Sequence, residues 1–350
     1  MFNLKIEKSP APLWVKLLLP IFAVIITMII TSIFSYISNI DPLETFRYLL
    51  VAPLSSRVST IEIFVKSTPL ILTGAAVIFA FRAGYWNIGA EGQFYAGAIV
   101  AAWLGQILVG FPVWLSITLM VLGGFIGGML WALPSAFLKV NLNVDEVVTT
   151  LLMNTIVLFF ISYLLNGPWR DPISFWPQSP TLLENTQFFK LLPNSRLHFG
   201  FIIAVFTMLI IWFILNKTPF GLKMRAAGLG KDAAEFAGIK VNKTIFITAL
   251  VSGGIAGLAG LGEVAGIHYH LIEALSGNAG YTGIIVATLG GLNPIGGTFA
   301  ALFIGLIDTG AQTVSRYLGV PIYLGDVIQS ILLLVTLAIF LLQNYRIKRS

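Results

Sequence analysis

Two short patterns in this sequence have residue types and spacings that could bind a nucleotide. Gly260, Gly262 and Ala265 fit the G-x-G-x-x-A pattern of dinucleotide-binding turns. That pattern requires a turn between a strand and a helix, whereas this copy lies inside a long apolar run. The triplet Gly230–Asp232 resembles part of a phosphate-binding loop, but its aspartate replaces the hydroxyl residue that would hold magnesium. We therefore predict no nucleotide site and no cofactor in this chain.

A third cluster has residue types that could bind a metal ion. His268 and His270 are two residues apart, with Glu263 and Glu273 nearby. Residues two apart do not share one face of a helix, so polar residues at the end of a membrane span are the more ordinary interpretation. The sequence contains no cysteine, which excludes disulfides and thiolate metal sites. We predict neither a metal site nor a catalytic residue.

Polar side chains inside apolar runs are the remaining candidates for chemistry. Burying them in lipid is costly, so they often line the path of a polar solute. The candidate translocation path comprises Asn87, Glu91, Gln93, Asn154, Asn278 and Asn293. Glu263, Asp308 and Gln312 are further polar residues of the second half that could line such a path.

Some of these polar residues also have structural interpretations. The group from Asn87 to Gln93 could equally stabilise a helix break. Asp145 and Glu146 follow Asn143 at the expected start of a helix, where carboxylates interact favourably with the helix dipole.

Membrane-spanning helices must position these side chains. Of the 350 residues, 57% are hydrophobic and only 10% are charged, whereas a soluble domain carries about 25% charge. The mean hydropathy is +0.89, and several apolar runs reach the roughly 20 residues that cross a bilayer. We predict an all-α polytopic membrane protein with one domain over residues 1–350. The expected spans are Leu13–Ile37, Ile61–Phe81, Ala90–Val109, Val113–Phe137, Val147–Leu165, Phe199–Leu215, Ile245–Ile267, Tyr281–Leu292, Ile295–Ala311 and Ile322–Leu342.

The basic residues indicate the orientation of these spans. They gather near both termini and across residues 217–243, as the positive-inside rule predicts for cytoplasmic segments. Two cytoplasmic termini require an even number of crossings, so we predict ten, with eight as the alternative. The proline-rich stretch Asn166–His198 then forms an external loop. A half-helix or irregular segment is expected around His268–Gly280. The net charge of +6 reflects this orientation and does not indicate nucleic-acid binding.

The basic segment 217–243 interrupts the apolar runs with glycines and charges. Its stretch Lys231–Ala237 favours a short helix, and Phe220, Met224 and Phe236 are its expected apolar contacts. A short helix on the cytoplasmic face can dock in a groove of a soluble partner and transmit movement. Alternatively, its charges only fix topology and contact lipid headgroups. The residues predicted to couple this chain to an ATPase are Gly221, Lys223, Arg225, Ala226, Ala227, Gly228, Ala233, Ala234 and Gly238.

Three stretches resemble the permease subunits of bacterial ATP-binding-cassette importers, in the family that serves ribose-type sugars, branched-chain amino acids and nucleosides. They are Trp86–Gln93 (WNIGAEGQ), the segment Gly221–Gly238, and Gly290–Gly297 (GGLNPIGG). This resemblance extends over most of the chain from Ile61 onward.

Two further stretches are similar to one branch of that family, the nucleoside permeases that work with a basic-membrane-lipoprotein receptor. They are Asn143–Asn154 (NVDEVVTTLLMN) and Gly167–Pro172 (GPWRDP). The sequence departs from that branch at Asp145, where the relatives usually have asparagine. The resemblance implies a type II importer fold in a bacterial cytoplasmic (inner) membrane. It also implies a second, homologous but different permease chain, two ATPase subunits that bind the ATP, and an external solute receptor.

These observations predict a transport subunit that imports a nucleoside or a related small polar solute. Within the same class, the alternatives are a sugar of the ribose type or a branched-chain amino acid. An ion-coupled secondary transporter would work without any ATPase. A self-contained membrane enzyme would instead use Asp145, Glu146 or the pair His268 and His270.

Overall fold

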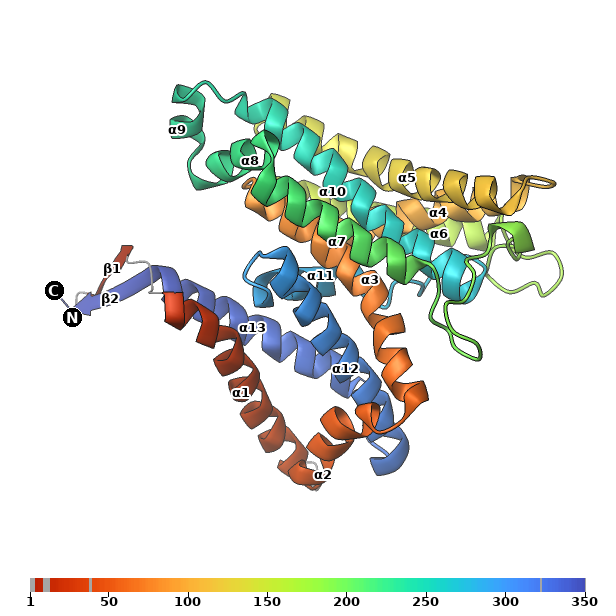
Figure 1. Cartoon of the computed structure of the whole chain (residues 1–350), viewed down its shortest axis with the longest axis horizontal. Helices are drawn as coiled ribbons and strands as arrows, with labels where there is room; N and C mark the ends of the chain where they lie inside the picture. The colour runs from red at the N-terminus through yellow and green to blue at the C-terminus, as the bar shows by residue number, and fades with distance from the viewer. Residues whose placement is uncertain (1–3, 9–12, 38–39, 322, 350) are drawn as a thin grey trace.

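The computed structural model describes residues 4–8, 13–37, 40–321 and 323–349, which fold into helices with one short ribbon of strands (Figure 1). The elements are β1 (Leu4–Lys8), α1 (Leu13–Ile37), α2 (Pro42–Phe46), α3 (Arg57–Arg82), α4 (Ala90–Ile107), α5 (Val113–Leu142), α6 (Glu146–Asn166), α7 (Gly200–Lys217), α8 (Pro219–Leu229), α9 (Lys231–Phe236), α10 (Val241–Glu263), α11 (Ala279–Leu289), α12 (Pro294–Leu318), α13 (Leu324–Asn344) and β2 (Tyr345–Arg349). A π-helical turn, Val264–His268, extends α10.

Each predicted span corresponds to one of these helices. In the described part of the chain, six helices are long and apolar enough to cross a membrane, namely α3, α5, α6, α7, α10 with its extension, and α12. The remaining predicted spans are α1, α4, α11 and α13. With 11 residues, α11 is about half the length of a full crossing, although the sequence predicted a span there. The half-helix or irregular segment expected around His268–Gly280 is irregular over residues 269–278. The all-α polytopic membrane fold is therefore confirmed.

The start of α6 shows how local sequence sets a helix boundary. The Asp145 side chain accepts hydrogen bonds from the backbone N–H groups of Val147 (2.8 Å) and Val148 (3.4 Å), so this aspartate caps the helix. The neighbouring Glu146 does not cap its own helix. It forms an ion pair with Lys139 of α5 and accepts a hydrogen bond from the backbone of Trp86.

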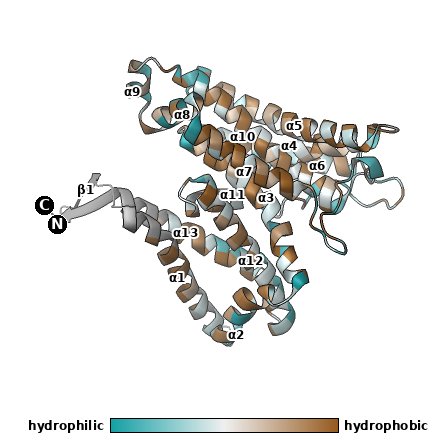
Figure 2. Cartoon of the chain, viewed as in Figure 1, coloured by the Kyte–Doolittle hydropathy of each residue, from teal (hydrophilic) through white to brown (hydrophobic). Residues whose placement is uncertain are grey.

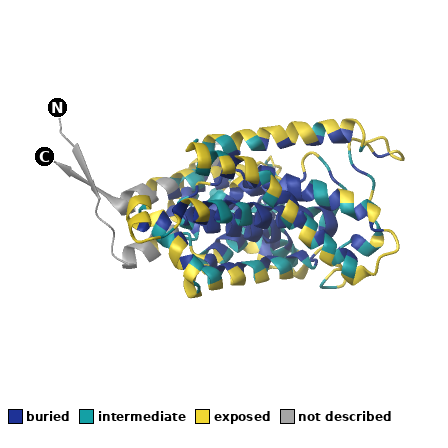
Figure 3. Ribbon diagram, turned by 90° about the horizontal axis from the view of Figure 1, so that it is seen from above, coloured by how far each residue is buried: buried dark blue, intermediate teal, exposed yellow. Residues whose placement is uncertain are grey.

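The helices are arranged around α3 and α10. In their most apolar stretches, 83% of α3 and 72% of α10 are buried, against 28–33% of α5, α6 and α7. The outer helices therefore present most of their surface outward, and Figure 3 shows the buried residues concentrated in the middle. Figure 2 shows hydrophobic residues along most of the helices and hydrophilic residues at α8 and α9.

Glycines allow α10 to approach α4 and α5 closely. A Cβ atom on Gly128 of α5 would lie 2.2 Å from the carbonyl oxygen of Gly253. A Cβ atom on Gly97 of α4 would lie 2.2 Å from the carbonyl oxygen of Gly257. Because helices in lipid gain little from hydrophobicity, this backbone contact is a main source of their packing energy.

The two ends of the described chain pair with each other. β1 and β2 form an antiparallel ribbon in which Leu4 lies opposite Arg349 and Lys8 lies opposite Tyr345. Next to the ribbon, α1 packs along α13. In Figure 1 the ribbon, α8 and α9 lie toward the left, and the loop that follows α6 lies at the right.

That loop, residues 166–198, is held against the end of α10 by backbone hydrogen bonds. The N–H of Phe188 donates to the carbonyl of Ala265, and the N–H of Leu182 donates to the carbonyl of Tyr269, both at 2.8 Å. The loop therefore packs against the transmembrane helices at the end of the fold opposite α8.

Candidate translocation cavity and coupling segment

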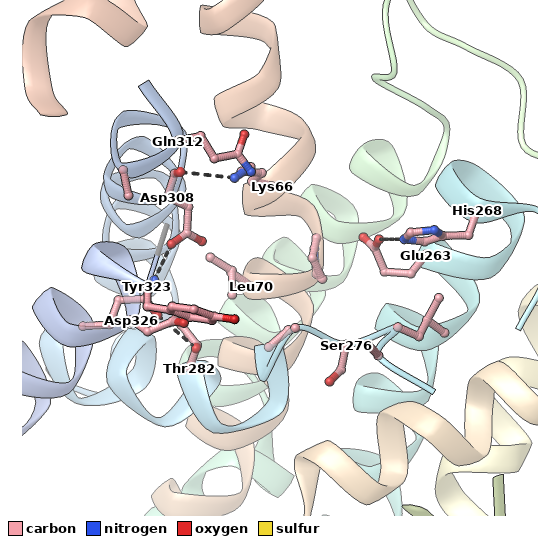
Figure 4. Close-up of a pocket in the computed structure, with 17 residues that line it drawn as sticks. Lys66, Leu70, Glu263, His268, Ser276, Thr282, Asp308, Gln312, Tyr323 and Asp326 are labelled. Atoms are coloured by element: carbon pink, nitrogen blue, oxygen red, sulfur yellow. Dashed lines mark hydrogen bonds and ion pairs between the residues drawn. The ribbon is translucent and has the colours of Figure 1, made fainter. Parts of the chain in front are cut away.

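A polar cavity of about 410 Å³ lies between α3, α12, α13 and the irregular segment between α10 and α11 (Figure 4). This volume is in the range of sites for small organic ligands. Its polar lining residues are Lys66, Glu263, His268, Ser276, Thr282, Asp308, Gln312, Tyr323, Asp326 and Gln329. Glu263, Asp308 and Gln312 are among the residues that the sequence indicated as possible path residues.

One wall of the cavity is a chain of hydrogen bonds that joins four helices. Lys66 of α3 donates to the backbone carbonyl of Asp308 in α12 at 3.2 Å. Gln329 of α13 donates to the Asp308 carboxylate and accepts a hydrogen bond from Thr282 of α11 at 3.2 Å. These hydrogen bonds fix the positions of the side chains that form the wall. The Lys66 ammonium group has three N–H donors, and two of them remain available to a solute.

The opposite wall carries a carboxylate and an imidazole. His268 Nε2 lies 3.9 Å from Glu263 Oε2, and both side chains are partly exposed to the cavity. In Figure 4 this pair lies across the cavity from Asp308 and Lys66. The cavity thus offers hydrogen-bond acceptors and donors on two facing walls, an arrangement suited to a solute with several hydroxyl or amide groups.

The cavity does not contain the six residues predicted for the translocation path. Asn87 and Gln93 are buried and bond to each other through both ends of their amides, at 2.8 and 3.1 Å. Asn87 also donates to Ser252 of α10 at 2.9 Å. These amides stabilise the break between α3 and α4, which is the structural interpretation that the sequence left open.

Asn154 and Glu91 also make contacts between helices. The side chain of Asn154 accepts from the N–H of Gly92 at 2.8 Å and donates to the hydroxyl of Tyr281 at 3.1 Å. Asn293 caps α12 by accepting from Ile295, and it is exposed, as is Asn278. Asn278 follows Gly277, which lines the cavity, so it is the path candidate nearest the cavity along the chain.

Glu91 of α4 holds the beginning of the half-helix α11. Its carboxylate accepts from the backbone N–H of Gly280 at 2.8 Å and from the hydroxyl of Ser276. Figure 4 shows Ser276 at the cavity, so this carboxylate positions a segment of the wall. The first N–H groups of a helix lack partners within the helix, and a buried carboxylate satisfies them well.

We expect Glu91→Ala to lower the free energy of unfolding by about 1–3 kcal/mol, because it leaves the buried N–H of Gly280 without a partner. Glu91→Gln should lose less than half as much, because an amide can accept from Gly280 and donate to Ser276. The measurement is thermal unfolding of the purified chain in detergent. Equal losses in the two variants would contradict this role of Glu91.

The predicted coupling segment folds as two helices, α8 and α9. The sequence predicted a helix only over Lys231–Ala237, and α9 is close to that range. The sequence did not predict α8, which begins at Pro219 with Thr218 as its cap. Phe236 was expected to make an apolar contact, but it is 97% exposed. Met224 does make its expected contact and is fully buried.

α8 packs against the turn that ends α3. A Cβ atom on Gly228 would lie 2.5 Å from the carbonyl oxygen of Arg82 and 3.1 Å from the N atom of Gly84. Gly84 has a φ of +77°, a conformation that side chains rarely adopt. At the other end of α8, a Cβ atom on Gly221 would lie 2.1 Å from the carbonyl oxygen of Ile214.

The same turn connects α8 to a second break in the helices. Arg82 Nε donates to the carbonyl oxygen of Leu292, in the turn between α11 and α12, at 2.7 Å. The stretches Trp86–Gln93 and Gly290–Gly297 are therefore linked to α8 through Arg82 and its neighbours. The sequence did not indicate this contact between the two motifs and α8.

The residues predicted to couple the chain to an ATPase divide between a packed and an exposed face. Gly221, Ala227 and Ala234 are buried, and Arg225 and Ala226 are half-buried. Lys223, Gly228, Ala233 and Gly238 are exposed. Leu229 is 91% exposed on the same segment. α8 and α9 thus present an apolar and basic surface outside the membrane spans, as a docking segment requires.

At the opposite end, a buried histidine anchors the loop 166–198. His198 is fully buried and accepts a hydrogen bond from the N–H of Gly200 through Nδ1 at 3.1 Å. Its Nε2 atom has no partner in the described residues. Burial, together with the charges of Lys190 and Arg196, lowers the pKa of the His198 imidazole from 6.5 to about 4.

We expect stability to fall between pH 6.5 and pH 4. In that range the unfolded chain protonates His198 and the folded chain does not, so the unfolded state binds more protons. The loss should approach about 3 kcal/mol at pH 4. Thermal unfolding across this pH range would measure it. His198→Gln stays neutral and should therefore remove this part of the dependence of stability on pH. An unchanged pH dependence would show that His198 is not its cause.

Comparisons with known proteins show the family of this chain. A family profile described as the permease component of branched-chain amino acid transport systems matches residues 59–337. The match covers most of the chain, including the cavity and the coupling segment. The chain therefore belongs to this family of transport permeases.

Curated relatives extend over nearly the whole chain. The guanosine ABC transporter permease protein NupP of Bacillus subtilis is 32% identical over 95% of this chain and 94% of its own length. The nucleoside ABC transporter permease protein NupB of Lactococcus lactis is 31% identical over 87% of this chain and 86% of its own length. The glucose ABC transporter permease protein TsgB13 of Haloferax volcanii is 28% identical over 99% of this chain and 94% of its own length.

Proposed function

We propose that this chain is the permease subunit of an ATP-binding-cassette importer and carries a nucleoside into the cytoplasm. The observation that carries the proposal is the cavity of about 410 Å³, lined by donors and acceptors between membrane helices. The names of the relatives NupP and NupB support the nucleoside as substrate. A sugar is the second candidate, because TsgB13 is named a glucose permease and a sugar has the same hydroxyl groups.

The transporter that we propose has further subunits. An ATPase would bind ATP and dock on α8 and α9, whose exposed Leu222, Leu229 and Phe236 are apolar anchors beside basic residues. The second permease would be a homologous, different chain. Two guanosine permease proteins of Bacillus subtilis, NupP and NupQ, both match this sequence and support that expectation. An external receptor would deliver the solute at the loop 166–198.

We place both termini on the cytoplasmic side of a bacterial cytoplasmic membrane. The pairing of β1 with β2 supports this orientation, because it brings the two ends of the described chain together. The ribbon carries Lys5, Lys8, Arg346, Lys348 and Arg349, which the positive-inside rule favours in the cytoplasm.

The test is uptake by proteoliposomes that contain the chain with its co-purified partners. We expect ATP-dependent accumulation of radiolabelled guanosine or uridine, and none when the ATPase cannot hydrolyse ATP. If only glucose or only leucine is taken up, the nucleoside is not the substrate, and that solute takes its place in the proposal. Uptake by the chain without an ATPase would contradict the proposed mechanism.

A further inference from the structure

The cavity is lined by more acidic than basic side chains. Its lining contains one ammonium group, Lys66, and three carboxyl groups, Glu263, Asp308 and Asp326. With all four ionised the formal charge is −2, from one positive and three negative groups. His268 also lines the cavity, and with its imidazole neutral the protonation of any one carboxyl group still leaves −1.

Most of the hydrogen-bonding capacity left for a solute is in acceptors. In the described part of the chain, the side chain of Asp326 makes no hydrogen bond, and that of Glu263 has only His268 at 3.9 Å. The Asp308 carboxylate is partly used by Gln329. A carboxylate can accept two hydrogen bonds side by side, as from two neighbouring hydroxyl groups.

We propose that this cavity selects its solute by charge, accepting uncharged solutes rich in hydroxyl groups and excluding phosphorylated ones. The inference rests on the proposed function and assigns the selection to this chain, separately from any receptor. A nucleoside offers the neighbouring hydroxyls of its ribose to a free carboxylate. A nucleoside monophosphate adds about −1.5 to −2 charges, which a negatively charged cavity repels.

Lys66 does not reverse this preference. Its ammonium group donates to the carbonyl of Asp308 and lies within the field of that residue's carboxylate. It can orient a neutral solute through its remaining donors. A phosphate at this position would meet three carboxyl groups for one ammonium group.

The absence of cysteine allows a direct test, because a single introduced cysteine is the only thiol of the chain. Gln312→Cys places it in the cavity, at a side chain that makes no hydrogen bond in the described residues. Thr181→Cys, exposed in the external loop, is the matched control. Each variant is reconstituted with its partners and treated with a cationic trimethylammonium or an anionic sulfonate methanethiosulfonate, and labelling of this chain is followed by mass.

We expect the cationic-to-anionic rate ratio to be at least about tenfold higher for Gln312→Cys than for Thr181→Cys. Comparing ratios cancels any difference in thiol ionisation. Guanosine should slow the labelling of Gln312→Cys, and guanosine monophosphate should not. Equal ratios at the two positions, or equal protection by both ligands, would overturn the charge selection. A high ratio without any nucleoside uptake would leave the charged cavity intact and overturn only the proposed substrate.

Discussion

Gly260→Ala is expected to lower the free energy of unfolding by about 2 kcal/mol or more. A Cβ atom at this position of α10 would lie 1.9 Å from the carbonyl oxygen of Phe94 in α4. Neither atom is the end of a flexible side chain, so the two helices must separate. The same helices meet at Gly97 and Gly257, and separation would loosen that contact as well. Thermal unfolding in detergent, with the yield of folded protein, measures the effect.

A matched control, Gly262, lies two residues further along α10. A Cβ atom on Gly262 would have only one neighbour within 4 Å, an atom of His198 at 3.9 Å. Gly262→Ala should therefore be neutral or stabilise α10 by up to about 1 kcal/mol, since alanine favours a helix over glycine. If both variants unfold at the same temperature as the parent, close backbone packing does not hold α4 to α10.

Gly228→Ala is expected to reduce ATP-driven uptake about fivefold or more while leaving the ATPase bound. The added Cβ atom would lie 2.5 Å from the carbonyl oxygen of Arg82, so α8 must move away from the turn that ends α3. An overpacking cost of about 1–3 kcal/mol corresponds to a loss of roughly fivefold to 150-fold in the population of the docked arrangement. Ala227→Glu should act similarly, because Ala227 is buried and a charge there would be desolvated.

Gly230→Ala is the control for this experiment. A Cβ atom at Gly230 would approach only the Cβ of Ala233, at 3.9 Å, and the backbone there is extended. Uptake and ATP hydrolysis are measured on the same proteoliposomes. We expect Gly230→Ala to keep both activities. Normal transport by Gly228→Ala would mean that the contact between α8 and α3 carries no movement.

The spans could be predicted from the sequence because the bilayer imposes one strong condition on them. A run such as Leu13–Ile37 must bury its backbone in helical hydrogen bonds, and α1 has those same bounds. α8 was missed because Gly221 and Gly228 weaken a helix in isolation. In the folded chain both glycines are required by close contacts with Ile214 and Arg82, so tertiary packing outweighs propensity.

The cavity could be predicted only in part. Glu263, Asp308 and Gln312 were noticed because polar residues stand out in apolar runs. Lys66 and Gln329 complete the wall, but they are far apart in the sequence and meet only through the packing of α3, α12 and α13. Asn87 and Gln93 gave an equally strong signal, yet they satisfy each other. Sequence alone does not distinguish a polar group that faces a cavity from one that has a partner.

The pairing of the chain ends has a consequence for biosynthesis. α1 is made well before α13, the helix along which it packs. Until then α1 must remain in lipid on its own, stable as a helix but without its neighbour. Assembly of this part of the protein therefore has to wait until α13 has been made, and a chain stalled before α13 would leave α1 without its neighbour.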